Sequence, residues 1–116
     1  MYTVFGCGGD RDRTKRPVMG KIASEMSKKV YVTSDNPRTE DPKKIIKEIL
    51  TGIKSKNYIA VENREEAIRT AIFESEDNAV ILIAGKGHEN YQEINGVRKH
   101  FSDKEVATKY LKEWAK

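Results

Sequence analysis

Short apolar segments alternate with amphipathic segments along most of the chain, and this alternation restricts the fold more than any single residue does. Four apolar segments, residues 2–5, 30–33, 58–61 and 79–84, have the composition of strands. The stretches between them carry apolar side chains at helical spacing. Because strands that alternate with helices form parallel sheets with right-handed crossovers, the sequence predicts an α/β domain with a mostly parallel sheet.

Capping signals indicate where the helices begin. Asp41 can cap a helix that has Pro42 at its first position. Asn63 and Ser102 are each followed three residues later by a glutamate, as in a capping box. Pro17 suits the first turn of an earlier helix. The apolar side chains expected to form the inner faces of the helices are Ile22, Ala23, Met26, Ile45, Ile46, Ile49, Leu50, Ile53, Ala67, Ile68, Ala71, Ile72, Val106, Tyr110, Leu111 and Trp114.

Two further segments predict how the sheet ends. Residues 79–84 are nearly all apolar, which is typical of a strand buried on both faces. Residues 91–94 and 97–101 flank the tight-turn sequence Asn95-Gly96 and predict a hairpin. We expect this hairpin to add an antiparallel edge to the sheet.

Length and charge limit the possible functions. The 116 residues suffice for one compact core, so we expect residues 1–116 to form a single domain without a separate cofactor module. The net charge is +4, and the basic residues are interleaved with 18 acidic ones, so no basic stripe indicates nucleic-acid binding.

The chain carries no sign of an oxidising or membrane environment. Cys7 is the only cysteine, which excludes a disulfide within the chain. No segment has the length of a membrane span, and no signal peptide opens the chain. These features predict a cytoplasmic protein. The short strand at residues 2–5 follows Met1 directly, which suggests that the chain begins part-way into a larger protein.

Three unusual loops follow predicted strands: residues 6–16, 35–38 and 85–89. In a parallel sheet the loops that follow the strands lie at one edge, and ligands of open α/β sheets bind there. We therefore expect a ligand site where these three loops meet.

The side chains of these loops suit a ligand that carries both signs of charge. The guanidinium groups of Arg11 and Arg38 can bind carboxylates through two parallel hydrogen bonds. Asp35 and Glu89 can accept hydrogen bonds from an ammonium group, and Asn36 can donate and accept. The set predicts a site for an amino acid, and glycines 85 and 87 would let the ligand approach the backbone.

Other interpretations of these residues remain open at this stage. The segment Gly6-Cys7-Gly8-Gly9 lacks the third glycine of a dinucleotide fingerprint, which argues against a nicotinamide or flavin cofactor. Asp35-Asn36-Pro37 could be only a turn that ends a strand. Lys86 and His88 could be solvated loop residues.

Neither cysteine nor metal chemistry is indicated. Cys7 has no base fixed beside it by the sequence, so a packed thiol is favoured over a nucleophile. No cluster of His, Cys and Asp has the spacing of metal ligands, so we expect no metal in this domain.

Four blocks of sequence occur in order along the chain: Gly6-Cys7-Gly8-Gly9-Asp10-Arg11-Asp12, Lys15-Arg16-Pro17-Val18-Met19-Gly20, Thr33-Ser34-Asp35-Asn36-Pro37-Arg38 and Gly85-Lys86-Gly87-His88-Glu89. Together they resemble the C-terminal domain of the Mur ligases of peptidoglycan synthesis. The resemblance covers essentially the whole chain. It implies a Rossmann-like, three-layer fold with helices on both faces of the sheet.

The resemblance also implies a function. Mur ligases of this type join an amino acid to a UDP-N-acetylmuramoyl peptide and convert ATP to ADP and phosphate. The peptide carboxylate is phosphorylated first, and the amine of the amino acid then attacks the acyl phosphate. In the family, ATP and Mg²⁺ are bound by a central domain and the uridine nucleotide by an N-terminal domain. We therefore expect no catalytic residue in residues 1–116 and no activity from this domain alone.

The Asp-Asn-Pro-Arg sequence is similar to the signature of family members that add meso-diaminopimelate to UDP-N-acetylmuramoyl-L-alanyl-D-glutamate. The residues that the resemblance assigns to the substrate are Arg11, Asp35, Asn36, Pro37, Arg38, Gly85 and Glu89. By position, Asn36 and Arg38 would hold the distal carboxylate with the help of Arg11, and Glu89 would accept from the distal ammonium. Lys86 and His88 are possible phosphate contacts when the domains close.

Arg38 favours a diamino diacid over lysine, because it would face lysine's ammonium group with no carboxylate to bind. It does not separate meso-diaminopimelate from lanthionine. Two other functions stay open: a freestanding module that senses an amino acid or a nucleotide, and a small nucleic-acid-binding domain.

Overall fold

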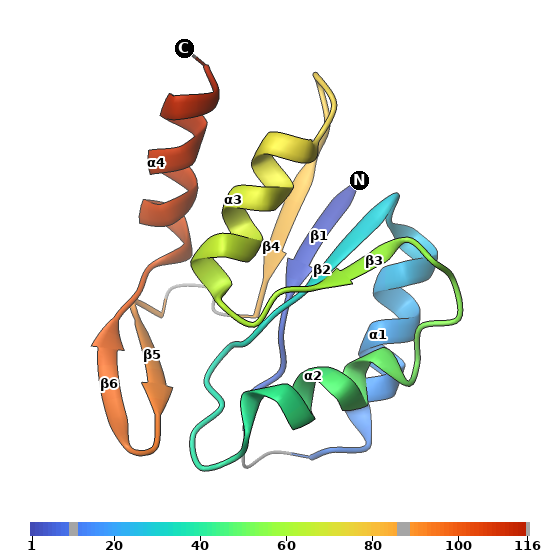
Figure 1. Cartoon of the computed structure of the whole chain (residues 1–116), viewed down its shortest axis with the longest axis vertical. Helices are drawn as coiled ribbons and strands as arrows, with labels where there is room; N and C mark the ends of the chain where they lie inside the picture. The colour runs from blue at the N-terminus through green and yellow to red at the C-terminus, as the bar shows by residue number, and fades with distance from the viewer. Residues whose placement is uncertain (10–11, 86–88, 116) are drawn as a thin grey trace.

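A computed structural model describes residues 1–9, 12–85 and 89–115 of the chain. Strands and helices alternate up to the fourth strand, and a hairpin and a last helix follow (Figure 1). The described elements are β1 (Tyr2–Phe5), α1 (Lys15–Met26), β2 (Lys29–Val32), α2 (Pro42–Leu50), β3 (Tyr58–Ala60), α3 (Arg64–Glu74), β4 (Ile81–Ala84), β5 (Tyr91–Ile94), β6 (Val97–His100) and α4 (Asp103–Trp114).

The main sheet has four parallel strands in the order β3-β2-β1-β4. Strand β1 lies between β2 and β4, with Val4 opposite both Tyr31 and Ile83. The loops that follow these three strands therefore leave the sheet next to one another. The predicted hairpin forms as β5 and β6, but it is a separate two-stranded sheet and does not extend the edge of the main sheet.

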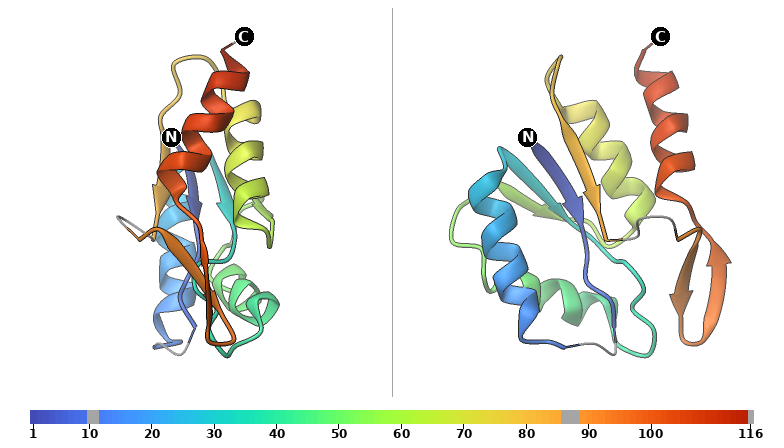
Figure 2. Two further views of the ribbon diagram at one scale, coloured as in Figure 1. Left: turned by 90° about the vertical axis from the view of Figure 1, so that its left-hand side faces the viewer. Right: turned by 180° about the vertical axis from the view of Figure 1, so that it is seen from behind.

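Helices cover both faces of the main sheet, as expected (Figure 2). Alternate strand residues face opposite sides. Val4 and Tyr31 pack with α3 and α4, whereas Phe5, Val30 and Val32 pack on the side of α1 and α2. The helical residues buried in these two cores are Ile45, Ile46, Ile49, Ala67, Ile68, Ala71, Ile72 and Tyr110.

The predicted starts of three helices are confirmed. Asp41, Asn63 and Ser102 each cap the helix that follows, with a side-chain oxygen that accepts a backbone N–H hydrogen bond in the first turn. Pro17 lies in the first turn of α1, where its missing N–H removes no helical hydrogen bond.

The predicted inner face of α1 is wrong. Ile22 and Met26 are 50% and 66% exposed, and α1 instead turns Gly20 toward α2. A Cβ at Gly20 would lie 2.3 Å from the carbonyl oxygen of Ile49, so the close packing of these two helices requires glycine. Because this small-residue side faces α2, the larger apolar side chains of α1 lie at its edge, and only Ala23 is partly buried.

Two other burial predictions are also wrong. Strand β4 is not buried on both faces: Ile81 and Ile83 pack against the core beside α3, whereas Leu82 points to the opposite face and is 47% exposed. On α4, Leu111 and Trp114 are 48% and 44% exposed. In this part of the helix Tyr110, not Leu111 or Trp114, reaches the core beside α3. An apolar groove lined by Met19, Ile22, Met26 and Leu82 results beside α1.

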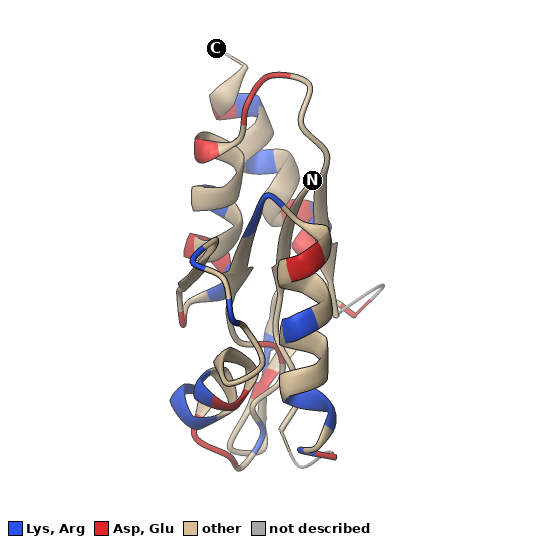
Figure 3. Ribbon diagram, turned by 90° about the vertical axis from the view of Figure 1, so that its right-hand side faces the viewer, with Lys and Arg blue, Asp and Glu red and all other residues tan. Residues whose placement is uncertain are grey.

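The charges are mixed along the chain. Basic and acidic segments lie close together on the helices (Figure 3), as the interleaved sequence predicts. In the part of the chain that the structure describes, no helix is long and apolar enough to cross a membrane.

Candidate functional site

The loops after β1, β2 and β4 meet at one edge of the sheet and enclose an open cavity of about 460 Å³. Gly6 and Gly8 line it from the first loop, Asp35 from the second and Gly85 from the third, and Lys15 borders it at the start of α1. The convergence expected from the parallel topology is therefore present. Among the described residues of the predicted site, Asp35 and Gly85 line this cavity.

Gly85 allows the loop after β4 to approach the other two. Its φ angle of +116° is one that side-chain-bearing residues rarely adopt. A Cβ there would lie 3.5 Å from Asp35 Oδ2 and 3.5 Å from the carbonyl oxygen of Gly6. Both are ordinary van der Waals distances, so the backbone conformation of this loop, rather than a lack of space, requires glycine at position 85.

Gly6 has an equivalent role in the loop after β1. A Cβ at Gly6 would lie 2.2 Å from the carbonyl oxygen of Thr33, so only glycine lets this loop pass so close to the end of β2. The side chains of Thr33 and Ser34 then donate to the carbonyl oxygen of Glu62, at 3.2 and 2.8 Å. The end of β2 is thus fixed from both sides before Asp35 begins.

Asn36 and Glu89 lie side by side beyond the cavity-lining Asp35. Asn36 is 2% exposed, and its Nδ2 donates to Glu89 Oε1 at 3.1 Å. The backbone N–H of Glu93 donates to Asn36 Oδ1 at 2.9 Å. Two separate parts of the chain, the loop after β2 and the segment from Glu89 into β5, therefore hold the two side chains in one place.

Arg38 joins this group from the same loop. Its Nη1 donates to the carbonyl oxygens of Gly9, at 2.9 Å, and Asn36, at 3.3 Å. The residue is half-buried and has a φ angle of +54°, in the left-handed region that is uncommon for arginine. This backbone turn directs the Arg38 guanidinium back toward Asn36 and the loop after β1.

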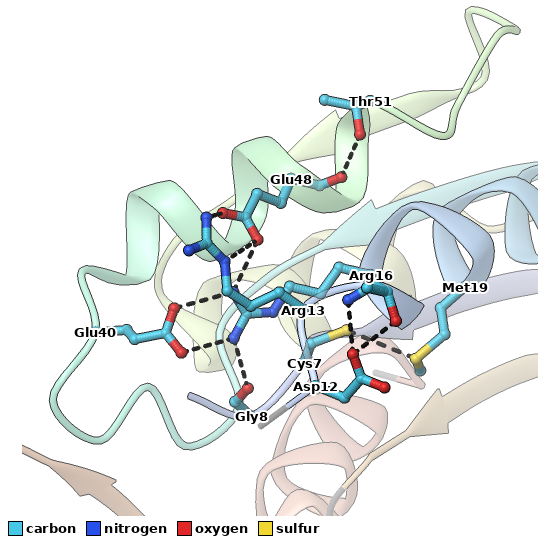
Figure 4. Close-up of polar contacts among 10 residues, drawn as sticks. Cys7, Gly8, Asp12, Arg13, Arg16, Met19, Glu40, Glu48 and Thr51 are labelled. Atoms are coloured by element: carbon cyan, nitrogen blue, oxygen red, sulfur yellow. Dashed lines mark hydrogen bonds and ion pairs between the residues drawn. The ribbon is translucent and has the colours of Figure 1, made fainter. Parts of the chain in front are cut away.

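A buried arginine that the sequence did not single out fixes the start of α1. Arg16 is 1% exposed and donates to both carboxylate oxygens of Glu40, to Glu48 and to the carbonyl oxygen of Gly8 (Figure 4). Arg13 binds the same Glu48 carboxylate. Hydrogen bonds from Arg13 and Arg16 hold the pKa of Glu48 below its usual value. The network ties the loop after β1 to α2.

A second buried arginine holds the other side of the site. Both oxygens of the Asp103 carboxylate accept hydrogen bonds from Arg64, each at 2.8 Å. Arg64 also donates to the carbonyl oxygens of Ser34, at 3.1 Å, and Ala84, at 3.0 Å. One guanidinium therefore links the ends of β2 and β4 to the first turns of α3 and α4.

Cys7 has the environment of a packed thiol. It is 9% exposed, and its sulfur lies 3.7 Å from the Met19 sulfur. Burial raises the pKa of the thiol to about 11, so it is protonated at neutral pH. This agrees with the interpretation favoured by the sequence.

Arg11, Lys86 and His88 lie outside the described residues. Pro37 is buried, and its carbonyl packs against Gly9, where a Cβ would lie 1.8 Å away. Among residues 1–9, 12–85 and 89–115, no group of three or more His, Cys, Asp and Glu side chains could hold a metal ion.

Comparison with known proteins gives one family. Residues 1–87 match the family model described as "Mur ligase, glutamate ligase domain". Three curated relatives are 2,6-diaminopimelate ligases that act, by name, with UDP-N-acetylmuramoyl-L-alanyl-D-glutamate. Those of Clostridium acetobutylicum and Clostridium botulinum are 53% and 55% identical over 113 residues, and that of Haemophilus ducreyi is 54% identical over 112.

The aligned regions cover 97%, 97% and 96% of this chain but only 23%, 23% and 22% of these relatives. A solved structure of a ligase with the same name has a TM-score of 0.92 and 44% sequence identity, and the match covers 99% of this chain and 24% of that one. The chain thus spans about a quarter of the length of the proteins it matches.

Proposed function

Because this chain belongs to the Mur ligase family, through its glutamate ligase domain, we propose that it is the C-terminal domain of a meso-diaminopimelate-adding ligase (MurE) and holds the incoming diamino acid. The observation that carries the proposal is the cluster of Asn36, Arg38 and Glu89 beside the cavity lined by Asp35 and Gly85. We treat residues 1–116 as this one domain.

The roles follow from the charges of the cluster. The Arg38 guanidinium and the Asn36 amide would bind the distal carboxylate of the diamino acid, with Arg11 as a second guanidinium. Glu89 would accept from the distal ammonium, and Asp35 offers a second carboxylate next to the cavity. In the structure Arg38 donates to backbone carbonyl oxygens and Asn36 donates to Glu89. The cluster is therefore already ordered.

The rest of the reaction belongs to the longer polypeptide. Mur ligases use ATP and Mg²⁺, and we assign both to regions beyond residues 1–116, together with the UDP-linked peptide. Residues 1–116 would bind the diamino acid and orient its attacking amine. Because the other substrates are ATP and a UDP-linked peptide, we place the enzyme in the cytoplasm.

The site is expected to prefer a diacid. Lysine lacks the distal carboxylate, so its binding would leave the Arg38 guanidinium desolvated and without an anionic partner. Such an unpaired buried charge costs about 3–5 kcal/mol. Lanthionine retains both carboxylates and both amines, so we expect it to be a much closer competitor than lysine.

Steady-state kinetics of the full-length ligase tests the proposal. ADP release would be measured with the UDP-linked dipeptide and, in turn, meso-diaminopimelate, lanthionine and lysine. We expect kcat/KM for lysine to be on the order of 100-fold or more below that for meso-diaminopimelate. Equal values would show that the diacid assignment is wrong. Binding of a diamino acid by a polypeptide that forms no ADP would instead indicate a sensing module.

A further inference from the structure

The hairpin of β5 and β6 is attached to the loop that carries Asn36 and Arg38. The Arg38 N–H donates to the carbonyl oxygen of Glu93 at 3.1 Å, and the Asn95 N–H donates to the carbonyl oxygen of Arg38 at 2.7 Å. These bonds pair Arg38 with Ile94 as a short parallel bridge. Figure 1 shows the hairpin beside the connection from β2 to α2. The hairpin therefore contacts the candidate site through the backbone of Arg38, although no hairpin residue lines the cavity beside Gly85.

One side chain of the hairpin reaches further along this loop. The Nε2 of Gln92, which is half-buried, donates to the carbonyl oxygen of Asp35 at 2.7 Å and to Ser34 Oγ at 3.0 Å. Both donors of the amide nitrogen are used on the two residues that directly precede Asn36. Gln92 thus holds the backbone at the point where the loop turns from the end of β2 into the candidate site.

The neighbours of Gln92 determine which way its amide points. A carbonyl oxygen can only accept, so Asp35 requires the nitrogen. The Ser34 hydroxyl donates its hydrogen to the carbonyl oxygen of Glu62 at 2.8 Å and therefore presents lone pairs to Gln92. A group without hydrogens at this position would face two oxygens and be repelled by both.

The effect of this clamp continues into the site. The carbonyl oxygen of Asn36, one residue beyond Asp35, accepts from the Gly9 N–H at 2.7 Å. The side chain of Asn36 lies between the Glu93 N–H and the Glu89 carboxylate. A shift of the Asp35 backbone would move the Asn36 side chain away from both partners, and the Arg38 guanidinium with it.

We propose that Gln92 is a positioning residue: its amide fixes the backbone at Ser34 and Asp35 and so sets where Asn36 and Arg38 meet the diamino acid. The inference rests on the proposed function. Gln92 touches no substrate in this scheme. It supports only the loop whose residues would bind the diamino acid. Loss of its amide should therefore weaken the binding of the diamino acid and not that of ATP or the UDP-linked dipeptide.

Two variants of the full-length ligase test this. Gln92→Glu keeps the shape of the side chain but faces the oxygens of Ser34 and Asp35 with a carboxylate, whereas Gln92→Leu only removes the hydrogen bonds. We expect KM for meso-diaminopimelate to rise about 30-fold in Gln92→Glu and about fivefold in Gln92→Leu, because small displacements of binding groups have large effects. The KM values for ATP and the UDP-linked dipeptide should stay within about twofold.

Lys99→Ala is the matched control, since Lys99 is exposed and lies opposite Gln92 in the hairpin register. It should leave all three KM values unchanged. An unchanged KM for meso-diaminopimelate in Gln92→Glu would overturn the proposal, and so would a parallel rise of all three KM values with a lowered Tm. If Gln92→Glu does not fold, Gln92→Leu decides. Failure of the proposed function is recognised separately, because the wild-type ligase would then form no ADP with meso-diaminopimelate.

Discussion

The side-chain amide of Asn36 donates to Glu89 across 53 positions of sequence, with Nδ2 and Oε1 3.1 Å apart. The Glu93 N–H can only donate, so it binds Asn36 Oδ1 and leaves Nδ2 for the carboxylate. The orientation of the amide is therefore fixed from both ends. A buried asparagine that is fixed in this way holds the Glu89 carboxylate in place, where under the proposed function it would accept from the distal ammonium group.

Asn36→Asp tests this relationship with almost no change of shape. The new carboxylate would still accept from the Glu93 N–H, but it would face Glu89 at hydrogen-bonding distance with no hydrogen between them. Like charges at such a buried position oppose each other strongly. We expect KM for meso-diaminopimelate to rise about 100-fold in steady-state assays of the full-length ligase, equivalent to about 2.7 kcal/mol.

Asn78→Asp provides the control, because it makes the same chemical change at an exposed loop residue. It should leave the kinetics unchanged. If Asn36→Asp retains the wild-type KM, the contact with Glu89 has no part in substrate binding.

Variants of Arg38 can separate its role in substrate binding from the effect of its backbone conformation on stability. Arg38→Gly removes the guanidinium but suits the φ angle of +54° better than arginine does. We therefore expect an unchanged or slightly higher Tm together with a KM for meso-diaminopimelate raised by two orders of magnitude or more, on the scale of about 3 kcal/mol for a charge-assisted pair. Arg38→Lys should raise KM nearly as much, since an ammonium group lacks the two-pronged geometry.

The kinetic result decides the role of Arg38. A large loss of Tm in Arg38→Gly with an unchanged KM would assign the residue to the fold alone, through its bonds to Gly9 and Asn36.

The meeting of the three loops at one edge could be predicted from the sequence, whereas the contacts that hold these loops in place could not. Alternation of apolar segments sufficed to place the loops with Asp35 and Gly85 at one edge, because parallel strands all end on the same side. Local turn chemistry likewise predicted the hairpin at Asn95-Gly96. Where that hairpin docks depends on contacts of Gln92 with residues more than 50 positions away, which no local pattern reveals.

The missed residues share this dependence on distant partners. Arg16 and Arg64 are buried with partners that are distant in sequence: Glu40 lies 24 residues after Arg16, and Asp103 lies 39 residues after Arg64. An arginine in a first helical turn ordinarily indicates an exposed position. The face of α1 was mistaken because Gly20, which carries no hydrophobic signal, makes the close contact with α2.

Asp103→Asn should destabilise the domain strongly. The substitution removes the carboxylate from Arg64 and leaves a charged guanidinium, 1% exposed, with only carbonyl partners and an amide. Breaking a buried ion pair in this way costs about 3–5 kcal/mol. Urea unfolding of the ligase, followed by a probe in α4, should show the loss.

Lys104→Gln is a suitable comparison, because Lys104 is exposed on the same helix. Its unfolding midpoint should match the wild type. Equal midpoints for Asp103→Asn would mean that Arg64 is held well enough by the carbonyl oxygens of Ser34 and Ala84.

The buried thiol of Cys7 should make both the stability of the domain and the rate of Cys7 alkylation depend on pH. Its pKa is raised from 9.0 to about 11, chiefly by burial, so the folded state favours the protonated thiol. The stabilisation from this effect is fully present below pH 9 and is lost as the pH rises through 11.

Because only the thiolate reacts, alkylation of folded Cys7 by iodoacetamide should be at least about 100-fold slower at pH 8 than that of an unfolded control peptide. Its rate should rise about tenfold per pH unit up to pH 10. Mass spectrometry of the Cys7 peptide measures both rates, and alkylation of the native protein at the rate of the peptide would show that the thiol is exposed at the cavity.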